Sequence, residues 1–177
     1  MLELNAELRQ LPGSSFKAAS GHTLFRRNDA IRYLHLIETG SANLVRYSRG
    51  GALIVMQRAA ADMVLAESSL FAERYHCDAI VTADLRAYRV RVPVVKQAMR
   101  DSPDLAIAMS HYLAREVQRM RVRSEILALK TVRARLDAWL TFNGSALPPR
   151  GAWKGVADDI GVSSEALYRE LATRDTR

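Results

Sequence analysis

The sequence is poor in cysteine, glycine and proline, and it has no long apolar run. One Cys in 177 residues excludes a disulfide scaffold and indicates a reducing compartment. The 9 Gly, 5 Pro and 49% hydrophobic residues exclude collagen-like and wholly disordered chains. No apolar run approaches the roughly 20 residues of a membrane-spanning helix, and Met1–Gln10 lacks a positive start followed by an apolar stretch. We therefore expect a cytoplasmic protein of one or two small domains with no membrane partner.

Lysine is also scarce. The chain has 26 basic against 19 acidic residues, a net charge of +7, and a pI near 10.0. The only lysines are Lys17, Lys96, Lys130 and Lys154, so arginine carries most of the positive charge. Arginine suits planar partners such as phosphates and guanine edges. A basic pI fits a nucleic-acid partner, but many ordinary proteins share it, so position along the chain must decide.

The first half of the chain, from about Phe16 to Val92, reads as short strands between turn signals. A turn at Thr39–Ser41 and another at Ser48–Gly51 have hairpin spacings. These runs predict a small antiparallel barrel or sandwich with two sheets, within an α+β fold. The expected strands are residues 34–37, 43–47, 53–56, 79–83 and 88–92.

A long helix is predicted next. Pro93 can open a first helix, and no Gly or Pro interrupts the chain from Pro103 to Leu129. The apolar stripe of this helix must pack either on the β domain or on a second copy of the chain, and the spacing favours the second copy. The stripe comprises Ala106, Met109, Leu113, Val117, Met120 and Leu127, and we expect its last five members to form a dimer interface.

The last 47 or so residues read as a small helical domain. Thr131 is a good N-cap for a helix that ends at Asn143-Gly144. Residues 153–171 fit a helix-turn-helix, in which Ala157 allows close helix crossing and Gly161 permits the tight turn. The second helix of this motif has an exposed start that could meet base edges in the major groove. The candidate DNA-binding residues are Ser163, Ser164, Glu165, Tyr168 and Arg169.

This order of elements resembles the Crp/Fnr family of bacterial transcription regulators. Its local marks are Ile37-Glu-Thr-Gly40, Ala66-Glu67, Ser69-Leu70-Phe71, Leu127-Ala-Leu129 and Glu165-x-x-Tyr168-Arg169. The resemblance implies a homodimer that reads a palindromic operator. Its expected parts are an effector domain at 1–98, with the fold of an antiparallel β jelly roll or double-stranded β-helix, a dimerisation helix at 99–129, and a helix-turn-helix domain, a truncated winged helix, at 130–177. The resemblance also implies double-stranded DNA, a small-molecule effector and RNA polymerase as partners.

The resemblance points to an effector site with altered residues. Glu67 matches the family's ribose-binding carboxylate, whereas Cys77 and Asp78 stand in place of its phosphate-binding Arg-Ser pair, and Met120 and Arg121 in place of its base-reading Thr-Ser pair. An aspartate would repel phosphate, so we expect weak or no cyclic AMP binding, and we predict no cofactor. Arg121 leaves room for a different anion.

Two possible metal sites have less support from the sequence than the regulator does. Haem held by His76 and Cys77 is improbable because neighbouring residues on a strand point to opposite faces. A cupin-type metalloenzyme using His22, His35 and Glu38 is a further alternative, but 12 residues separate the two histidines and the spacing is poor. We therefore expect no metal site and no enzyme activity.

The family's winged helix continues into two strands after the recognition helix. Here only Thr173 to Arg177 follow, so we expect the wing to be missing. Such a loss would weaken DNA affinity more than specificity. The alternative function is therefore an effector-binding dimer with impaired DNA binding.

Overall fold

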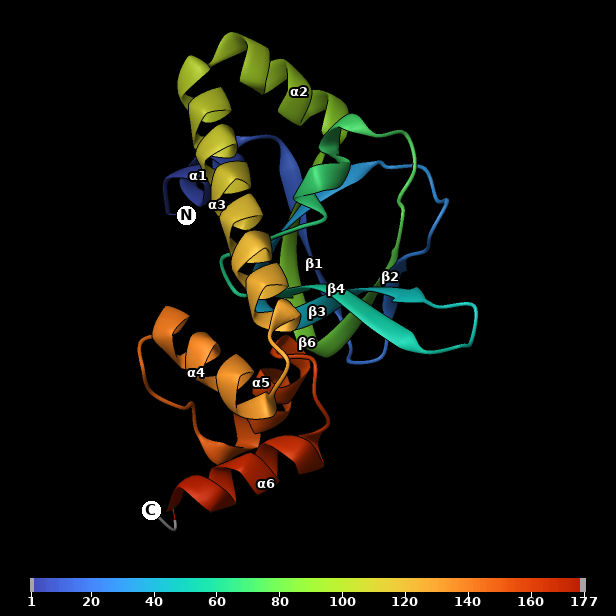
Figure 1. Ribbon diagram of the computed structural model, residues 1–177. Coiled ribbons are helices and arrows are strands. Elements are labelled where there is room, and N and C mark those ends of the chain that lie inside the picture. The colour runs from blue at the N-terminus through green and yellow to red at the C-terminus, as the bar shows by residue number, and fades with distance from the viewer. Residues whose placement is uncertain (1, 176–177) are drawn as a thin grey trace. The chain divides into compact units, whose positions relative to one another are not determined.

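A computed structural model describes residues 2–175 of the chain. It has an α+β fold that divides into two compact units, Met1–Leu113 (unit 1) and Ala114–Arg177 (unit 2). Unit 1 holds the strands and unit 2 is helical (Figure 1). None of the described helices is both long and apolar enough to cross a bilayer.

The strands of unit 1 pair in antiparallel fashion, as the sequence predicted, and they belong to one six-stranded sheet. The strand order is β1-β6-β3-β4, with β2 also paired to β6 and β5 to β3. The two long strands β3 and β6 run through the centre and pair along most of their length. The strands are β1 (Gly13–Ala18), β2 (Thr23–Phe25), β3 (Tyr33–Tyr47), β4 (Leu53–Ala60), β5 (Val64–Leu65) and β6 (Asp78–Arg91).

The turn predicted at Thr39–Ser41 is wrong, because β3 continues through it. Gly40 has a φ of +81°, and a Cβ atom on it would lie 2.1 Å from the carbonyl oxygen of Asp84 in β6. The register of the β3–β6 pair also shifts on both sides of Thr39. Gly40 therefore allows two long strands to bend together instead of ending a hairpin. The runs 79–83 and 88–92 are likewise parts of β6, except that Val92 begins a helix.

The predicted turn at Ser48–Gly51 is confirmed. β3 and β4 pair from Tyr47 opposite Leu53, and the Ser48 amide donates to the carbonyl of Ala52 at 2.9 Å. Gly51 takes the positive φ of +79° that this turn requires.

The helices follow the predicted order, with one addition. The sequence analysis did not predict α1, whose Leu4 and Leu8 are buried in the core of unit 1. The helices are α1 (Leu2–Gln10), α2 (Val92–Asp101), α3 (Pro103–Ala128), α4 (Val132–Phe142), α5 (Trp153–Asp159) and α6 (Ser164–Asp175), with short 3-10 turns η1 (Glu67–Phe71) and η2 (Arg150–Ala152).

The long helix α3 is confirmed, and its apolar stripe has two environments. Leu105, Met109 and Tyr112 are buried in the core of unit 1. The hydroxyl of Tyr112 accepts from the Val64 amide at 2.9 Å, which ties this part of the helix to β5. The prediction that Met109 lies in a dimer interface is therefore wrong, because its side chain is only 1% exposed within its own protomer.

Unit 2 packs its helices around a small apolar core. The Thr131 side chain accepts from the Ala134 amide at 3.1 Å, so Thr131 caps α4 as predicted. The predicted helices from Trp153 and from Ser164 are confirmed as α5 and α6. The buried residues of this core are Ile126, Leu136, Val156, Ala157, Ile160, Leu167 and Leu171.

Candidate nucleic-acid interface and effector residues

Helices α5 and α6 are joined by the tight turn that the sequence predicted. Gly161 has a φ of +66°, and the Val162 amide donates to the carbonyl of Ala157 at 2.9 Å. Ala157 is fully buried where the two helices pack. The Ser163 hydroxyl accepts from the Ala166 amide at 3.2 Å, so Ser163, rather than Ser164, is the N-cap of α6.

Arg135 of α4 holds this turn against the end of α3. Its guanidinium donates to the carbonyls of Leu127 and Leu129 at 3.0 and 2.7 Å, and to those of Ile160 and Gly161 at 3.1 and 3.2 Å. One side chain thus satisfies carbonyls at the end of α3 and at the turn before α6. Sequence analysis missed Arg135, because nothing in the sequence distinguishes it from the other arginines.

The start of α6 is open to solvent. Ser163, Glu165 and Arg169 are exposed and Ser164 is half-buried, so four candidate DNA-binding residues are accessible. Hydrogen bonds from the Glu165 backbone and from the Ser163 side chain lower the pKa of the Glu165 carboxyl group. Glu165 is therefore an ionised acceptor at neutral pH, close to a helix N-terminus that favours negative charge.

Tyr168 is only partly available. Its ring centroid lies 5.2 Å from that of Trp153, and the guanidinium carbon of Arg150 lies 5.7 Å from the centre of each ring. The Tyr168 side chain is still 38% exposed. Tyr168 therefore links α6 to Trp153 of α5 and to Arg150 of η2, while part of its side chain stays exposed.

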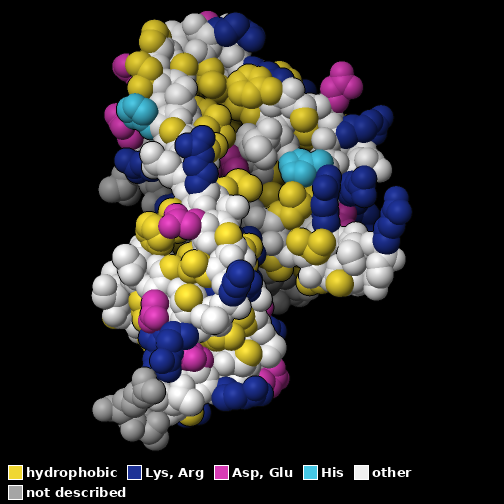
Figure 2. All heavy atoms as spheres, viewed as in Figure 1, with side chains coloured by type: hydrophobic (Ala, Val, Ile, Leu, Met, Phe, Trp, Pro, Cys, Tyr) yellow, Lys and Arg dark blue, Asp and Glu magenta, His cyan; other side chains and the backbone are white. Residues whose placement is uncertain are grey.

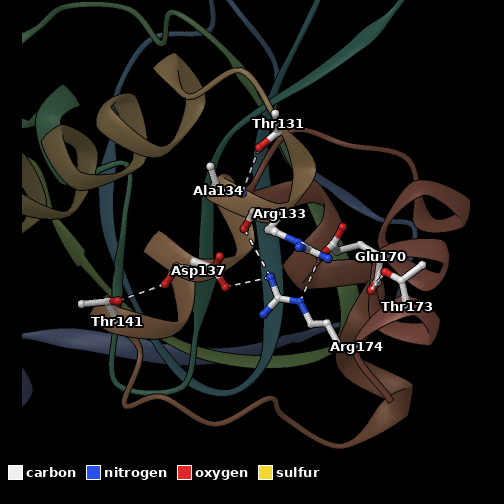
Figure 3. Close-up of polar contacts among 8 residues, drawn as sticks. All are labelled: Thr131, Arg133, Ala134, Asp137, Thr141, Glu170, Thr173 and Arg174. Atoms are coloured by element: carbon white, nitrogen blue, oxygen red, sulfur yellow. Dashed lines mark hydrogen bonds and ion pairs between the residues drawn. The ribbon is translucent and has the colours of Figure 1, made fainter. Parts of the chain in front are cut away.

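The far end of α6 is fixed to α4 by ion pairs (Figure 3). Arg174 contacts Asp137 at 2.7 Å and Glu170 at 3.1 Å, and Arg133 contacts the same Glu170 oxygen at 3.0 Å. The hydrogen bond from Arg133 is the main cause that lowers the pKa of Glu170. The helix is thus anchored at its carboxyl end and exposed at its amino end.

The second half of the α3 stripe is exposed in unit 2. Val117 is 47% exposed, Met120 64% and Leu127 38%. Leu113, the last residue of unit 1, is half-buried against the core of that unit. Apolar residues spaced three, four and seven apart on one helix form a continuous seam. Within the described part of unit 2, no other side chain buries Val117 or Met120.

Positive charge is not confined to the predicted DNA-binding residues of α6. Figure 2 shows Lys and Arg side chains gathered over the side of unit 1 that carries β2 and β4. Arg26, Arg27, Arg46 and Arg49 are exposed in this region. The assignment of the interface therefore depends on the geometry of α6 and not on net charge.

The predicted effector residues divide between the units, with Glu67, Cys77 and Asp78 in unit 1 and Met120 and Arg121 exposed in unit 2. The carboxylate of Glu67 is buried and accepts from the Gln57 side chain at 2.8 Å. Gln57 of β4 was missed by the sequence analysis.

Cys77 and Asp78 point to different surroundings. Cys77 is fully buried in the apolar core, where burial raises the pKa of its thiol. The Asp78 carboxylate accepts from the Arg27 amide at 2.6 Å. Cys77 therefore acts as a small core residue, and Asp78 holds the loop after β2.

The residues considered as metal ligands have other surroundings. Glu38 accepts from Arg86 at 2.8 Å and from Arg9 at 3.1 Å. His22 is exposed, whereas His35 is buried. Within residues 2–175, no three His, Cys, Asp or Glu side chains lie close enough to hold a metal ion.

Comparison with known proteins finds a match to one domain model and similarity to solved structures. Residues 15–102 match the model of the cyclic nucleotide-binding domain. No curated protein sequence matches the chain. The chain is similar in structure to FixK2 from Bradyrhizobium japonicum, with 16% identity, a TM-score of 0.75, and coverage of 94% of this chain and 86% of that one.

Two further solved structures have the same fold. The c-di-GMP responsive global regulator CLP from Xanthomonas campestris is 15% identical, with a TM-score of 0.71 over 98% of this chain and 91% of that one. TTHB099, a CRP-family transcriptional regulator from Thermus thermophilus, is 19% identical, with a TM-score of 0.66 over 89% of this chain and 83% of that one. At these identities the likeness concerns the fold.

Proposed function

We propose that the chain is a Crp/Fnr-like transcription regulator, a cytoplasmic homodimer that binds a palindromic operator in double-stranded DNA. The match of residues 15–102 to the cyclic nucleotide-binding domain and the fold shared with FixK2 and TTHB099 support this proposal. The proposal depends mainly on one observation, that α6 is anchored at its carboxyl end and exposed toward its amino end. Its carboxyl end is held by Arg174, and Glu165 and Arg169 are exposed in its first half. Binding, not catalysis, is the proposed activity.

The residues at the start of α6 supply the chemistry of base recognition. Arg169 can donate two hydrogen bonds to guanine, and the Glu165 carboxylate can accept from a cytosine amino group. Ser163 and Ser164 can contact phosphates near the helix N-terminus. Tyr168, held by Trp153, offers a ring edge for apolar contact with a base.

The exposed seam on α3 supplies the dimer contact. A second copy of the chain related by a two-fold axis would place Val117, Met120 and Leu127 against the same residues of its partner. A dimer of this kind matches a palindromic site, because two identical reading helices require two identical half-sites. RNA polymerase is the proposed protein partner in transcription.

An effector in the β domain would control this dimer. Glu67 is the family-like carboxylate, but its neighbours Cys77 and Asp78 provide no cation for a cyclic phosphate. Cys77 is buried and Asp78 accepts an amide hydrogen bond, so we propose weak or no binding of cyclic AMP. Titration calorimetry with cyclic AMP, and with c-di-GMP as a second probe, tests this.

The test of DNA recognition is selection from a pool of random duplexes, with sequencing at 50 and about 200 mM salt. We expect enrichment of a palindrome at both concentrations. Salt-sensitive binding without an enriched sequence would show phosphate contacts alone and would favour the alternative of an effector-binding dimer with impaired DNA binding. An absence of binding in the presence of candidate effectors would contradict the proposal.

A further inference from the structure

Unit 1 contains a cavity that none of the predicted effector residues lines. Its volume is about 470 Å³, within the range of small-molecule sites, and it lies beside β2 and the ends of β3 and β6. Four aromatic residues form much of its wall, namely Phe16, Phe25, Tyr33 and Tyr75. The rings of Phe25 and Tyr75 are stacked, with centroids 3.6 Å apart and an interplanar angle of 9°.

An arginine is held in this aromatic wall. The guanidinium carbon of Arg89 lies 4.8 Å from the ring centre of Tyr33 and 5.3 Å from that of Phe16. Its Nε donates to the Ser14 hydroxyl at 3.2 Å. Among the described residues, no carboxylate pairs with this guanidinium, so its two terminal nitrogens are available to a ligand.

A buried histidine lines the same cavity. His35 is 7% exposed, and its Nδ1 has no hydrogen-bond partner among the described residues. Burial, with the nearby charge of Arg89, lowers the pKa of His35 to about 4. The neutral ring therefore adds no charge of its own to the cavity wall, and its Nδ1 is sealed from solvent.

The charge of the cavity favours an anion. Arg32 and Arg89 line it together with one carboxylate, that of Asp29. Asp29 already accepts from the Arg26 amide at 2.8 Å. A planar guanidinium matches a carboxylate better than it matches a single neutral acceptor, because the two can form parallel hydrogen bonds.

We propose that this cavity binds a small aromatic carboxylate, with the carboxylate on Arg89 and the ring against Phe16, Tyr33 and Tyr75. The proposal concerns a site separate from Glu67 and does not depend on DNA recognition. A failed DNA selection would not contradict ligand binding in this cavity. Likewise, an absence of ligand binding would not contradict the proposed recognition of DNA by α6.

The test uses the full chain and three probes: 1-naphthoate, its neutral isostere 1-naphthamide, and inorganic phosphate. By titration calorimetry we expect saturable binding of 1-naphthoate and at least about tenfold weaker binding of 1-naphthamide, as one charge-assisted hydrogen bond would give. Phosphate should not compete, because it lacks an aromatic body. Equal binding of the acid and the amide, effective competition by phosphate, or no binding of 1-naphthoate would overturn the proposal.

Variants then locate the site. Arg89→Gln should weaken 1-naphthoate binding at least about tenfold. The matched control Arg86→Gln removes the same charge from the same strand at an exposed side chain and should leave binding unchanged. An unchanged affinity in Arg89→Gln, or an equal loss in both variants, would refute the assignment.

A measurement on the unmodified chain covers the case in which Arg89→Gln does not fold. In NMR spectra, 1-naphthoate should shift the ring resonances of Tyr33 and Tyr75 and leave those of Trp139 and Trp153 in unit 2 unchanged. Shifts confined to the tryptophans would place the ligand elsewhere and overturn the proposal.

Discussion

Gly161 packs directly against Leu127. A Cβ atom on Gly161 would lie 2.5 Å from Leu127 Cδ2 and 3.4 Å from a terminal nitrogen of Arg135. Leu127 ends the α3 stripe and Gly161 forms the turn before α6, so α3 and this turn meet without room for a methyl group. The carbonyls of both residues also accept from Arg135.

The first prediction follows from this contact. Gly161→Ala should lower the free energy of unfolding by at least about 1–2 kcal/mol, because alanine is strained at a positive φ and its methyl group displaces Leu127. Urea unfolding followed by circular dichroism measures the change. The matched control is Gly155→Ala in α5, where a Cβ atom meets nothing within 4 Å.

Gly155→Ala should instead raise the stability by up to about 1 kcal/mol, because alanine is the better helix former. Opposite signs in the two variants are expected. If both glycines tolerated alanine equally, the close contact between α3 and the turn would be contradicted.

The sequence predicted the helices of unit 2 well because their signals are local. The cap at Thr131 and the glycine of the turn at position 161 act within a few residues, and both are found as predicted. Gly40 shows where local reasoning fails. The glycine was read as a turn signal, but its lack of a Cβ atom is required by the approach of Asp84, 44 positions along the chain, which the sequence does not reveal.

The residues of the candidate sites also differ in whether local sequence signals could predict them. The exposed face of α6 follows from helical spacing, so Glu165 and Arg169 could be named in advance. The role of Arg135 and the cavity around Arg89 depend on contacts between distant segments, and periodicity carries no information about them. Met109 was misassigned because spacing shows which residues share a stripe but not which neighbour covers each part of it.

The second prediction concerns pH. The pKa of His35 is about 4 in the folded chain against an ordinary 6.5. Between these values the unfolded chain binds a proton that the folded chain does not, so stability rises with pH through this window and is lost as pH falls below 6.5. The loss by pH 4 is on the order of 3 kcal/mol.

His35→Phe should remove this part of the pH dependence, because phenylalanine cannot be protonated and fills a similar volume. Urea unfolding at several pH values from 4 to 7 measures it. The control His111→Gln, at an exposed position on α3, should keep the wild-type slope. A wild-type slope in His35→Phe would show that other groups cause the loss of stability at low pH.

The third prediction tests the dimer seam. Met120→Glu places a charge in an apolar contact and should convert the dimer into monomers, because burying an unpaired carboxylate is costly. Sedimentation equilibrium gives the association state. Gln118→Glu adds the same charge to an exposed position outside the stripe and should leave a dimer. An intact dimer in Met120→Glu would rule out the seam.

The fourth prediction tests base reading. Arg169→Ala should relax discrimination at one base pair of each half-site by roughly 1–3 kcal/mol, because the arginine's paired hydrogen bonds to guanine are lost. The measurement compares the affinities of the selected operator and of its single-base-pair variants at one salt concentration. Arg49→Ala removes an equal charge from an exposed turn of unit 1 and should leave the ranking of these sites unchanged. A uniform loss of affinity across all sites in Arg169→Ala would identify this arginine as a phosphate contact, since phosphate contacts carry no direct sequence information.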